Sequence, residues 1–100
     1  MIRHVILWQL KDGFSDTEKA RILEDMKSHL EALPGKVPGL ISLTVHTDPL
    51  PSSNADAMLD SVLTDPEALE DYRVHPVHVA AADTYVRPYV KNRVCMDFPQ

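Results

Sequence analysis

The segment from Arg3 to Lys11 constrains the fold of this chain most, because it has the pattern of a β-strand that is apolar on both faces. It is rich in β-branched and aliphatic residues and contains neither glycine nor proline. With a period of two, one face carries His4, Ile6, Trp8 and Leu10, and the other carries Arg3, Val5, Leu7 and Gln9. We therefore expect other parts of the protein to cover both sides of this strand.

A helix is predicted directly after this strand, from Asp16 to Leu33. Ser15 and Glu18 form the S-x-x-E pattern of a capping box, in which each side chain satisfies a free amide at a helix start. The sequence Pro34-Gly35 ends the helix. Within the helix, apolar residues at steps of three and four form one stripe, which consists of Leu23, Met26, Leu30 and Leu33.

The remaining elements follow from turn signals and composition. Residues 40–46 and 57–63 are predicted strands, although Ala, Met and Leu give the second one some helix propensity. Asp65 and Pro66 begin a second helix, and Pro76 interrupts it before it resumes from Val77 to Val86. A last strand is expected from Asn92 to Phe98, where apolar and polar residues alternate.

The predicted order is βαββαβ, which gives an α+β, ferredoxin-like sandwich with a four-stranded antiparallel sheet and helices on one face. One hundred residues are enough for one domain, spanning residues 1–100. Helices on one face leave the second apolar side of the first strand uncovered. We therefore expect a homodimer formed through the sheet face without helices.

Charge and composition exclude several functional classes. A net charge of −5 does not suit a nucleic-acid partner, which requires a basic surface. The single cysteine, Cys95, cannot form an internal disulfide, and we expect it to be an inert buried thiol. No signal peptide or membrane-spanning apolar run is visible, so a cytoplasmic protein without a membrane role is expected.

Tyr72 and His78 are the candidate catalytic residues. A neutral imidazole can act as a general base, and a phenol can donate a hydrogen bond to a developing oxyanion. We expect His78 to take a proton from a carbon flanked by carbonyls, Tyr72 to donate a hydrogen bond to the developing oxyanion, and Asp97 to orient the His78 ring. His75, directly before Pro76, is expected to have a structural role, either as the cap of the second helical segment or as a partner to a strand carbonyl. The alternative for His78 is a structural hydrogen bond to a backbone carbonyl.

Metal, phosphate and cofactor sites are not predicted. His75 and His78 are three residues apart, but Pro76 distorts the helical geometry that would bring them to one ion. There is no cysteine pair or H-E-x-x-H pattern for zinc, and the three glycines are scattered at turns. We therefore expect neither a metal nor a cofactor.

At four places the chain resembles the stress-responsive A/B barrel domain family, a group of dimeric α+β barrels. The matching segments are Ile2–Leu7, Pro34–Leu43, Tyr72–His78 and Arg93–Phe98. Many members have no assigned reaction, whereas one branch, similar to olivetolic acid cyclase, closes a polyketide by aldol condensation without a cofactor. The resemblance to that branch implies catalytic roles for Tyr72 and His78 and a pocket role for His4.

The resemblance also has departures that concern the substrate. Ala57 stands where the cyclase has a histidine, and Trp8 replaces a smaller aliphatic residue on the pocket side of the first strand. Residues 80–82 are all alanine, where the cyclase has side chains suited to an alkyl tail. The cyclase substrate is therefore not transferred to this chain.

The expected function is binding of a small carbonyl-bearing or aromatic molecule in the cleft between helices and sheet. The residues predicted to line this cleft are His4, Ile6, Trp8, Met26 and Leu59. Two alternatives stay open. The chain is a non-catalytic stress or assembly protein if Trp8 fills the cleft, or it performs cofactor-free, monooxygenase-like chemistry, as related dimeric α+β barrels do.

Overall fold

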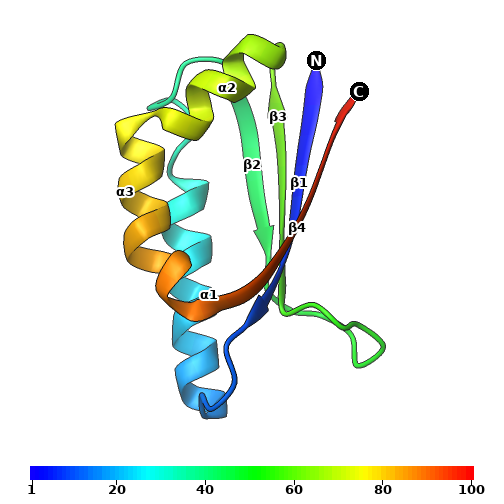
Figure 1. Ribbon diagram of the computed structural model, residues 1–100, viewed down its shortest axis with the longest axis vertical. Coiled ribbons are helices and arrows are strands. Elements are labelled where there is room, and N and C mark those ends of the chain that lie inside the picture. The colour runs from blue at the N-terminus through cyan, green and yellow to red at the C-terminus, as the bar shows by residue number, and fades with distance from the viewer.

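The computed structural model describes residues 1–100 and confirms the predicted βαββαβ order (Figure 1). The sheet is antiparallel, with the strand order β2-β3-β1-β4. The termini lie side by side, because β1 and β4 pair along their whole length. The elements are β1 (Ile2–Leu10), α1 (Asp16–Glu31), β2 (Leu40–His46), β3 (Ala57–Leu63), α2 (Pro66–Val74), α3 (Pro76–Tyr85), a 3₁₀ turn (Arg87–Tyr89) and β4 (Val90–Pro99).

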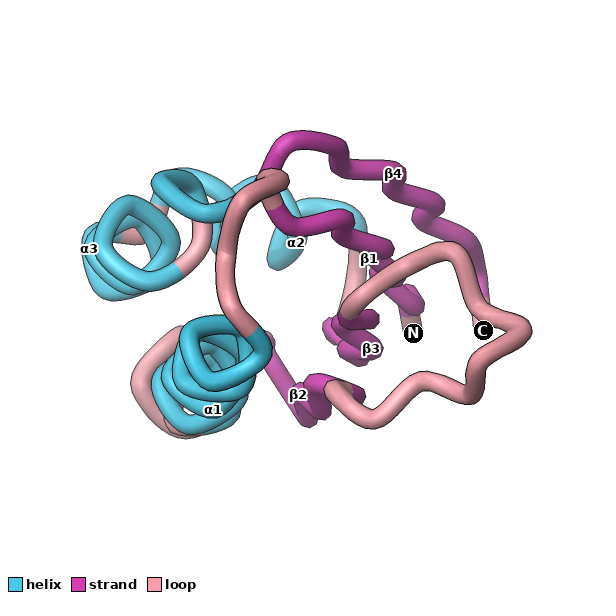
Figure 2. Tube along the Cα trace, turned by 90° about the horizontal axis from the view of Figure 1, so that it is seen from below, coloured by secondary structure: helices cyan, strands magenta, loops and turns pink.

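The helices all cover one face of the sheet, and the opposite face has no helix over it (Figure 2). None of the helices is long and apolar enough to cross a membrane. The predicted inner side of β1 is buried against the helices, and the loop between β2 and β3 extends beyond the end of the sheet. On the uncovered face, strand pairing aligns apolar side chains, several of them exposed: Val5, Leu7, Met58, Val94 and Met96.

One polar pair lies among the apolar side chains of the uncovered face. Arg3 donates two hydrogen bonds to the carboxylate of Asp60, from Nε at 2.9 Å and from Nη2 at 3.0 Å. This bidentate contact lowers the pKa of Asp60 and keeps it ionised. Because these two charges already satisfy each other, the pair does not prevent burial of the face against another apolar surface.

The first helix has the predicted cap and a slightly different buried stripe. Ser15 and Glu18 form both hydrogen bonds of the capping box. The buried residue in the second turn is Ile22, whereas Leu23 is only half-buried, which corrects the predicted stripe by one position. The helix ends at Glu31, two residues before the predicted end, and Leu33 is buried in the turn that follows.

Gly39 allows α2 to approach the sheet closely. Its φ of +82° is in the region that glycine adopts readily, and a Cβ at this position would lie 2.6 Å from Cβ of Ala68. The amide of Thr64 also donates to the carbonyl of Gly39 at 3.0 Å. These contacts fix the start of α2, the helix that carries Tyr72.

His75 separates α2 from α3, as the position of Pro76 predicts. Its backbone is extended, with φ −63° and ψ 130°, and Pro76 is the first residue of α3. The His75 side chain accepts a hydrogen bond from the amide of Val77, so the predicted capping role is confirmed. The break turns α3 relative to α2 and brings His78 back over the ring of Tyr72.

Candidate functional site

A cavity of about 340 Å³ lies between the inner side of the sheet and the helices α2 and α3. Its volume is at the lower end of the range for small-ligand sites, ~300–1,000 Å³. Six of the predicted site residues line it: His4, Ile6, Trp8, Leu59, Tyr72 and His78. Met26, predicted to contact substrate, is wholly buried in the core below α1 and does not line the cavity. Leu30, one turn later in the same buried stripe of α1, does line the cavity, so position along the helix rather than helical phase keeps Met26 out of it.

Tyr72 lies on the inner side of α2, and only 1% of its surface is exposed. Its hydroxyl is buried and has no hydrogen-bond partner, although most buried polar groups in proteins have one. Burial raises the pKa of the Tyr72 phenol above its ordinary value of 10, and the positive charge of Arg93 opposes this shift only in part. The phenol therefore keeps its proton and can donate it in a hydrogen bond to a bound molecule.

His78 lies in the first turn of α3, half-buried, with its ring stacked on the ring of Tyr72. The ring centroids are 4.1 Å apart and the planes differ by 29°. Nδ1 faces the backbone carbonyl of Arg73 at 3.3 Å, so it is the nitrogen that carries the proton. This leaves Nε2 free as a base, and burial lowers the pKa of His78, which keeps the ring neutral near pH 7.

His4 provides a second imidazole in the cavity. It lies opposite Asp97 in the β1–β4 register, and its Nδ1 bonds the Asp97 carboxylate. Ser61 also donates to the His4 carbonyl at 3.0 Å, which holds β1 at this point. Asp97 was expected to orient His78, but the structure pairs it with His4 instead. The His4 ring meets the ring of Tyr72 nearly edge-on, with 6.0 Å between centroids.

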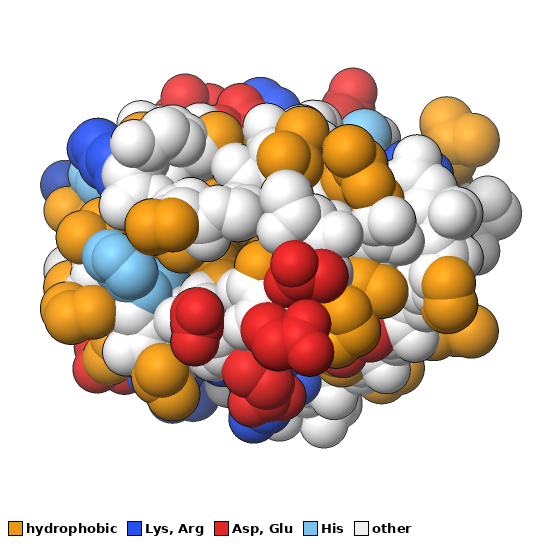
Figure 3. Space-filling model, turned by 90° about the horizontal axis from the view of Figure 1, so that it is seen from above, with side chains coloured by type: hydrophobic (Ala, Val, Ile, Leu, Met, Phe, Trp, Pro, Cys, Tyr) orange, Lys and Arg blue, Asp and Glu red, His pale blue; other side chains and the backbone are white.

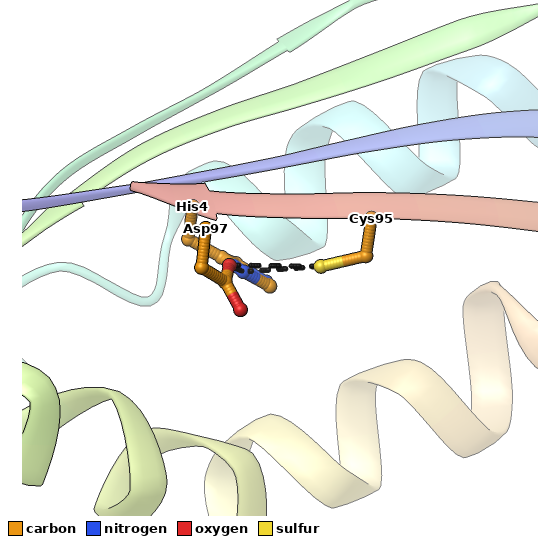
Figure 4. Close-up of side chains that lie close together, drawn as sticks. All are labelled: His4, Cys95 and Asp97. Atoms are coloured by element: carbon orange, nitrogen blue, oxygen red, sulfur yellow. Dashed lines mark hydrogen bonds and ion pairs between the residues drawn. The ribbon is translucent and has the colours of Figure 1, made fainter. Parts of the chain in front are cut away.

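Cys95 completes the one group of three potential metal ligands in the chain (Figure 4). The donor atoms of His4, Cys95 and Asp97 all lie within 4.8 Å of one another, and the side chains point from β1 and β4 toward α2 and α3. Partial burial and the charge of Asp97 raise the pKa of Cys95, so it is a thiol rather than the thiolate that metals bind. A metal would also have to break the bond between His4 and Asp97. Cys95 itself is exposed, which corrects the predicted burial.

Three arginines at the cavity were missed by the sequence interpretation: Arg73, Arg87 and Arg93. Arg73 pairs with Glu70 on α2, and Arg87 pairs with Asp83 on α3. Arg93 lies opposite Trp8 in the β1–β4 register and has no ion pair. The polar side of β4, whose alternation was visible in the sequence, is the signal that could have identified Arg93.

Comparison with known proteins places the chain in a group whose functions are mostly unassigned. Residues 2–100 match the sequence family described as the stress responsive A/B barrel domain. No curated protein matches. A dimeric protein of unknown function with a ferredoxin-like fold from Bacteroides fragilis is 27% identical, with a TM-score of 0.90, over 97% of this chain and 93% of that one.

Two further solved structures share the fold. A dimeric ferredoxin-like protein of unknown function from Thermobifida fusca is 26% identical, with a TM-score of 0.82, over 99% of this chain and 90% of that chain. A hydroxynitrile lyase from Passiflora edulis is 16% identical, with a TM-score of 0.71, over 97% of this chain and 90% of that chain. The last likeness is one of fold alone.

Proposed function

The chain belongs to the stress-responsive A/B barrel domain family, and we infer that it performs cofactor-free acid–base chemistry on a small carbonyl compound bound in the cavity between the sheet, α2 and α3. The observation that carries this proposal is the Tyr72 hydroxyl, a buried donor without a partner in a cavity that also presents His78. A carbonyl oxygen bound there would satisfy the hydroxyl. An unpaired buried polar group destabilises the free protein, so its presence at a cavity favours a ligand role.

The proposed chemistry follows from the two rings and needs no added cofactor. Nε2 of His78 takes a proton from a carbon beside the carbonyl, and the C–H electron pair moves into an enolate. Tyr72 donates a hydrogen bond to the enolate oxygen but keeps its own proton. In an aldol-type closure the enolate carbon attacks a second carbonyl, and the protonated His78 returns its proton to the alkoxide. Protons and electrons balance within the substrate and His78.

The cavity beside Trp8 favours this proposal over the non-catalytic alternative. In that alternative Trp8 fills the cleft, but Trp8 is one of the residues that line an open volume of about 340 Å³. The fold is shared with a hydroxynitrile lyase, so it is compatible with enzymatic activity. No feature of the cavity favours monooxygenase-like chemistry over acid–base chemistry.

Exchange of acidic C–H protons tests the proposal without knowledge of the natural substrate. Phenylacetone is incubated with the protein in D₂O, and loss of its benzylic proton signal is followed by NMR. The protein should accelerate exchange, and His78→Gln should slow the protein-dependent rate about a hundredfold, as expected for removal of a general base. His46→Gln is the control, because His46 is an exposed histidine on β2 away from the cavity. Equal rates for the two variants would reject His78 as the base.

We also propose that the protein is a homodimer joined through the uncovered face. The similar proteins from Bacteroides fragilis and Thermobifida fusca are described as dimeric. On this chain Val94 and Met96 are 64% and 66% exposed on that face, which is unusual for large apolar side chains grouped on one surface. Burial of this face would give β1 the second apolar contact that its sequence requires.

A charge on the uncovered face should break the dimer. Met96→Glu would bury a carboxylate in an apolar interface and should shift the sedimentation velocity profile from dimer to monomer. Val77→Glu introduces the same change on the outer side of α3 and should leave the dimer intact. A dimeric Met96→Glu protein would place the interface elsewhere.

A further inference from the structure

The lining of the cavity has a charge opposite to that of the chain. The chain has 15 acidic and 10 basic residues, and acidic side chains gather on the end of the molecule seen in Figure 3. Yet the 13 lining residues include three arginines and neither aspartate nor glutamate. The other ten are two histidines and eight apolar residues. A cavity with apolar walls and cationic groups is suited to a molecule with an apolar body and an anionic end.

Arg93 differs from the other two arginines in having no ion pair. Arg73 is held by Glu70 at 3.1 Å, and the partner of Arg87 is a carboxylate one turn away on α3. Each of these two guanidinium groups therefore already has a carboxylate beside it. Arg93 has no carboxylate partner, since Asp97, the acidic residue on the same side of β4, bonds to His4. One guanidinium at the cavity is therefore uncompensated.

The position of Arg93 places its charge beside the reactive groups. Arg93 and Trp8 are direct neighbours in the β1–β4 register, so their side chains project from the same face of the sheet. The field of Arg93 reaches the phenol of Tyr72, where it partly offsets the rise in pKa that burial causes. A ligand whose anionic group bound Arg93 would lie across Trp8 with its other end directed to Tyr72 and His78.

We propose that the cavity selects a monocarboxylate, with the carboxylate bound by Arg93 and an apolar, carbonyl-bearing body held against Trp8 and Tyr72. A planar guanidinium matches a carboxylate with two parallel hydrogen bonds. One free guanidinium balances one negative charge, whereas a phosphate group would require more donors than the cavity leaves unpaired. This inference rests on the proposed function, because it names the substrate class for the same cavity.

Fluorescence of Trp8 tests this selection directly, since Trp8 is the only tryptophan and lines the cavity. Three probes of similar shape are titrated: phenylacetate, its neutral amide phenylacetamide, and benzylphosphonate. Phenylacetate should bind about tenfold more tightly than the amide, as expected for one charged hydrogen-bonding contact at a partly open site. Added salt should weaken binding of the acid and leave that of the amide unchanged.

Arg93→Gln should remove the preference for the acid and leave the affinity for the amide unchanged. Arg21→Gln is the matched control, because Arg21 is exposed on α1 and has no place in the cavity. Circular dichroism and thermal melting of both variants verify folding. A change in fold would weaken both probes, whereas loss of an ionic contact weakens only the acid.

Other outcomes overturn the inference in distinguishable ways. Equal affinity for acid and amide, or a preference that survives Arg93→Gln, rejects a carboxylate site and leaves the acid–base proposal standing. Tighter binding of benzylphosphonate than of phenylacetate would replace the carboxylate with a phosphoryl group. Absence of any quenching by all three probes rejects the inference and also argues against a ligand-binding cavity, and hence against the proposed function.

Discussion

Replacement of Tyr72 by phenylalanine should stabilise the protein while it impairs catalysis. In most proteins this substitution is destabilising, because a buried phenol usually has a hydrogen-bond partner. Here the hydroxyl is buried without one, so the folded state carries a desolvation cost that phenylalanine would remove. That cost is ~1–3 kcal/mol for an unsatisfied polar group, and we take the lower end, about 1 kcal/mol, because the hydroxyl borders a cavity. For a domain of this size 1 kcal/mol corresponds to a rise in Tm of roughly 4–8 °C.

Differential scanning calorimetry at one fixed protein concentration measures this change, since association would otherwise alter Tm. The same preparation should lose most of its phenylacetone exchange activity, because the enolate oxygen has lost its donor. Tyr89→Phe is the control: Tyr89 is half-buried at the edge of the core, and its substitution should change neither quantity appreciably. A Tm that falls by several degrees in Tyr72→Phe would mean that the hydroxyl is satisfied in the folded protein, and the reasoning would fail.

Two further predictions concern the pH dependence of stability and the packing of Gly39. Burial lowers the pKa of His78 below its ordinary 6.5, so the unfolded chain binds this proton more tightly than the folded one. The contribution of His78 to the free energy of unfolding should therefore be fully present above pH 6.5 and decline as pH falls below it. His78→Gln should flatten this decline in urea titrations, and an unchanged slope would assign the effect to other groups. Gly13→Ala and Gly39→Ala both place a side chain at positive φ, at a cost of roughly 1 kcal/mol each. Gly39→Ala should lose clearly more in the same titrations, because its Cβ also collides with α2; equal losses would contradict this packing.

Local signals predicted the elements well, because turn chemistry fixes their ends. The bounds of β2 and β3 match the expected residues 40–46 and 57–63. Turn-forming residues precede each strand: proline and glycine precede β2, and asparagine and aspartate precede β3. The ambiguous helix propensity of β3 is overridden by its pairing with two neighbouring strands. The α1 stripe was misplaced at one position, because a period of 3.6 allows Ile22 or Leu23 and only packing selects between them.

The candidate site was predictable where its residues are close in sequence. Tyr72 and His78 are six residues apart, and the break at Pro76 was sufficient to expect them together. The partner of Asp97 depends on the β1–β4 register, which joins residues 93 positions apart and cannot be read from either strand alone. Arg93 was missed for a similar reason: the alternation of β4 groups it with Cys95 and Asp97, but only its pairing with Trp8 in the same register places Arg93 at the cavity.

The break at His75 separates α3, which lines the cavity, from the parts of the fold that form most of the core. The sheet and α1 hold most of the core, whereas α3 buries a single residue, Ala82, which also lines the cavity. Ala82 is therefore a small side chain in the cavity wall, on a helix that adds little to the buried core. A larger residue at this position would reshape the cavity without unfolding the sheet that holds His4 and Trp8. The same scaffold is thus open to new ligands through exchange of this alanine, so substrate range can diverge within such a fold faster than the fold itself.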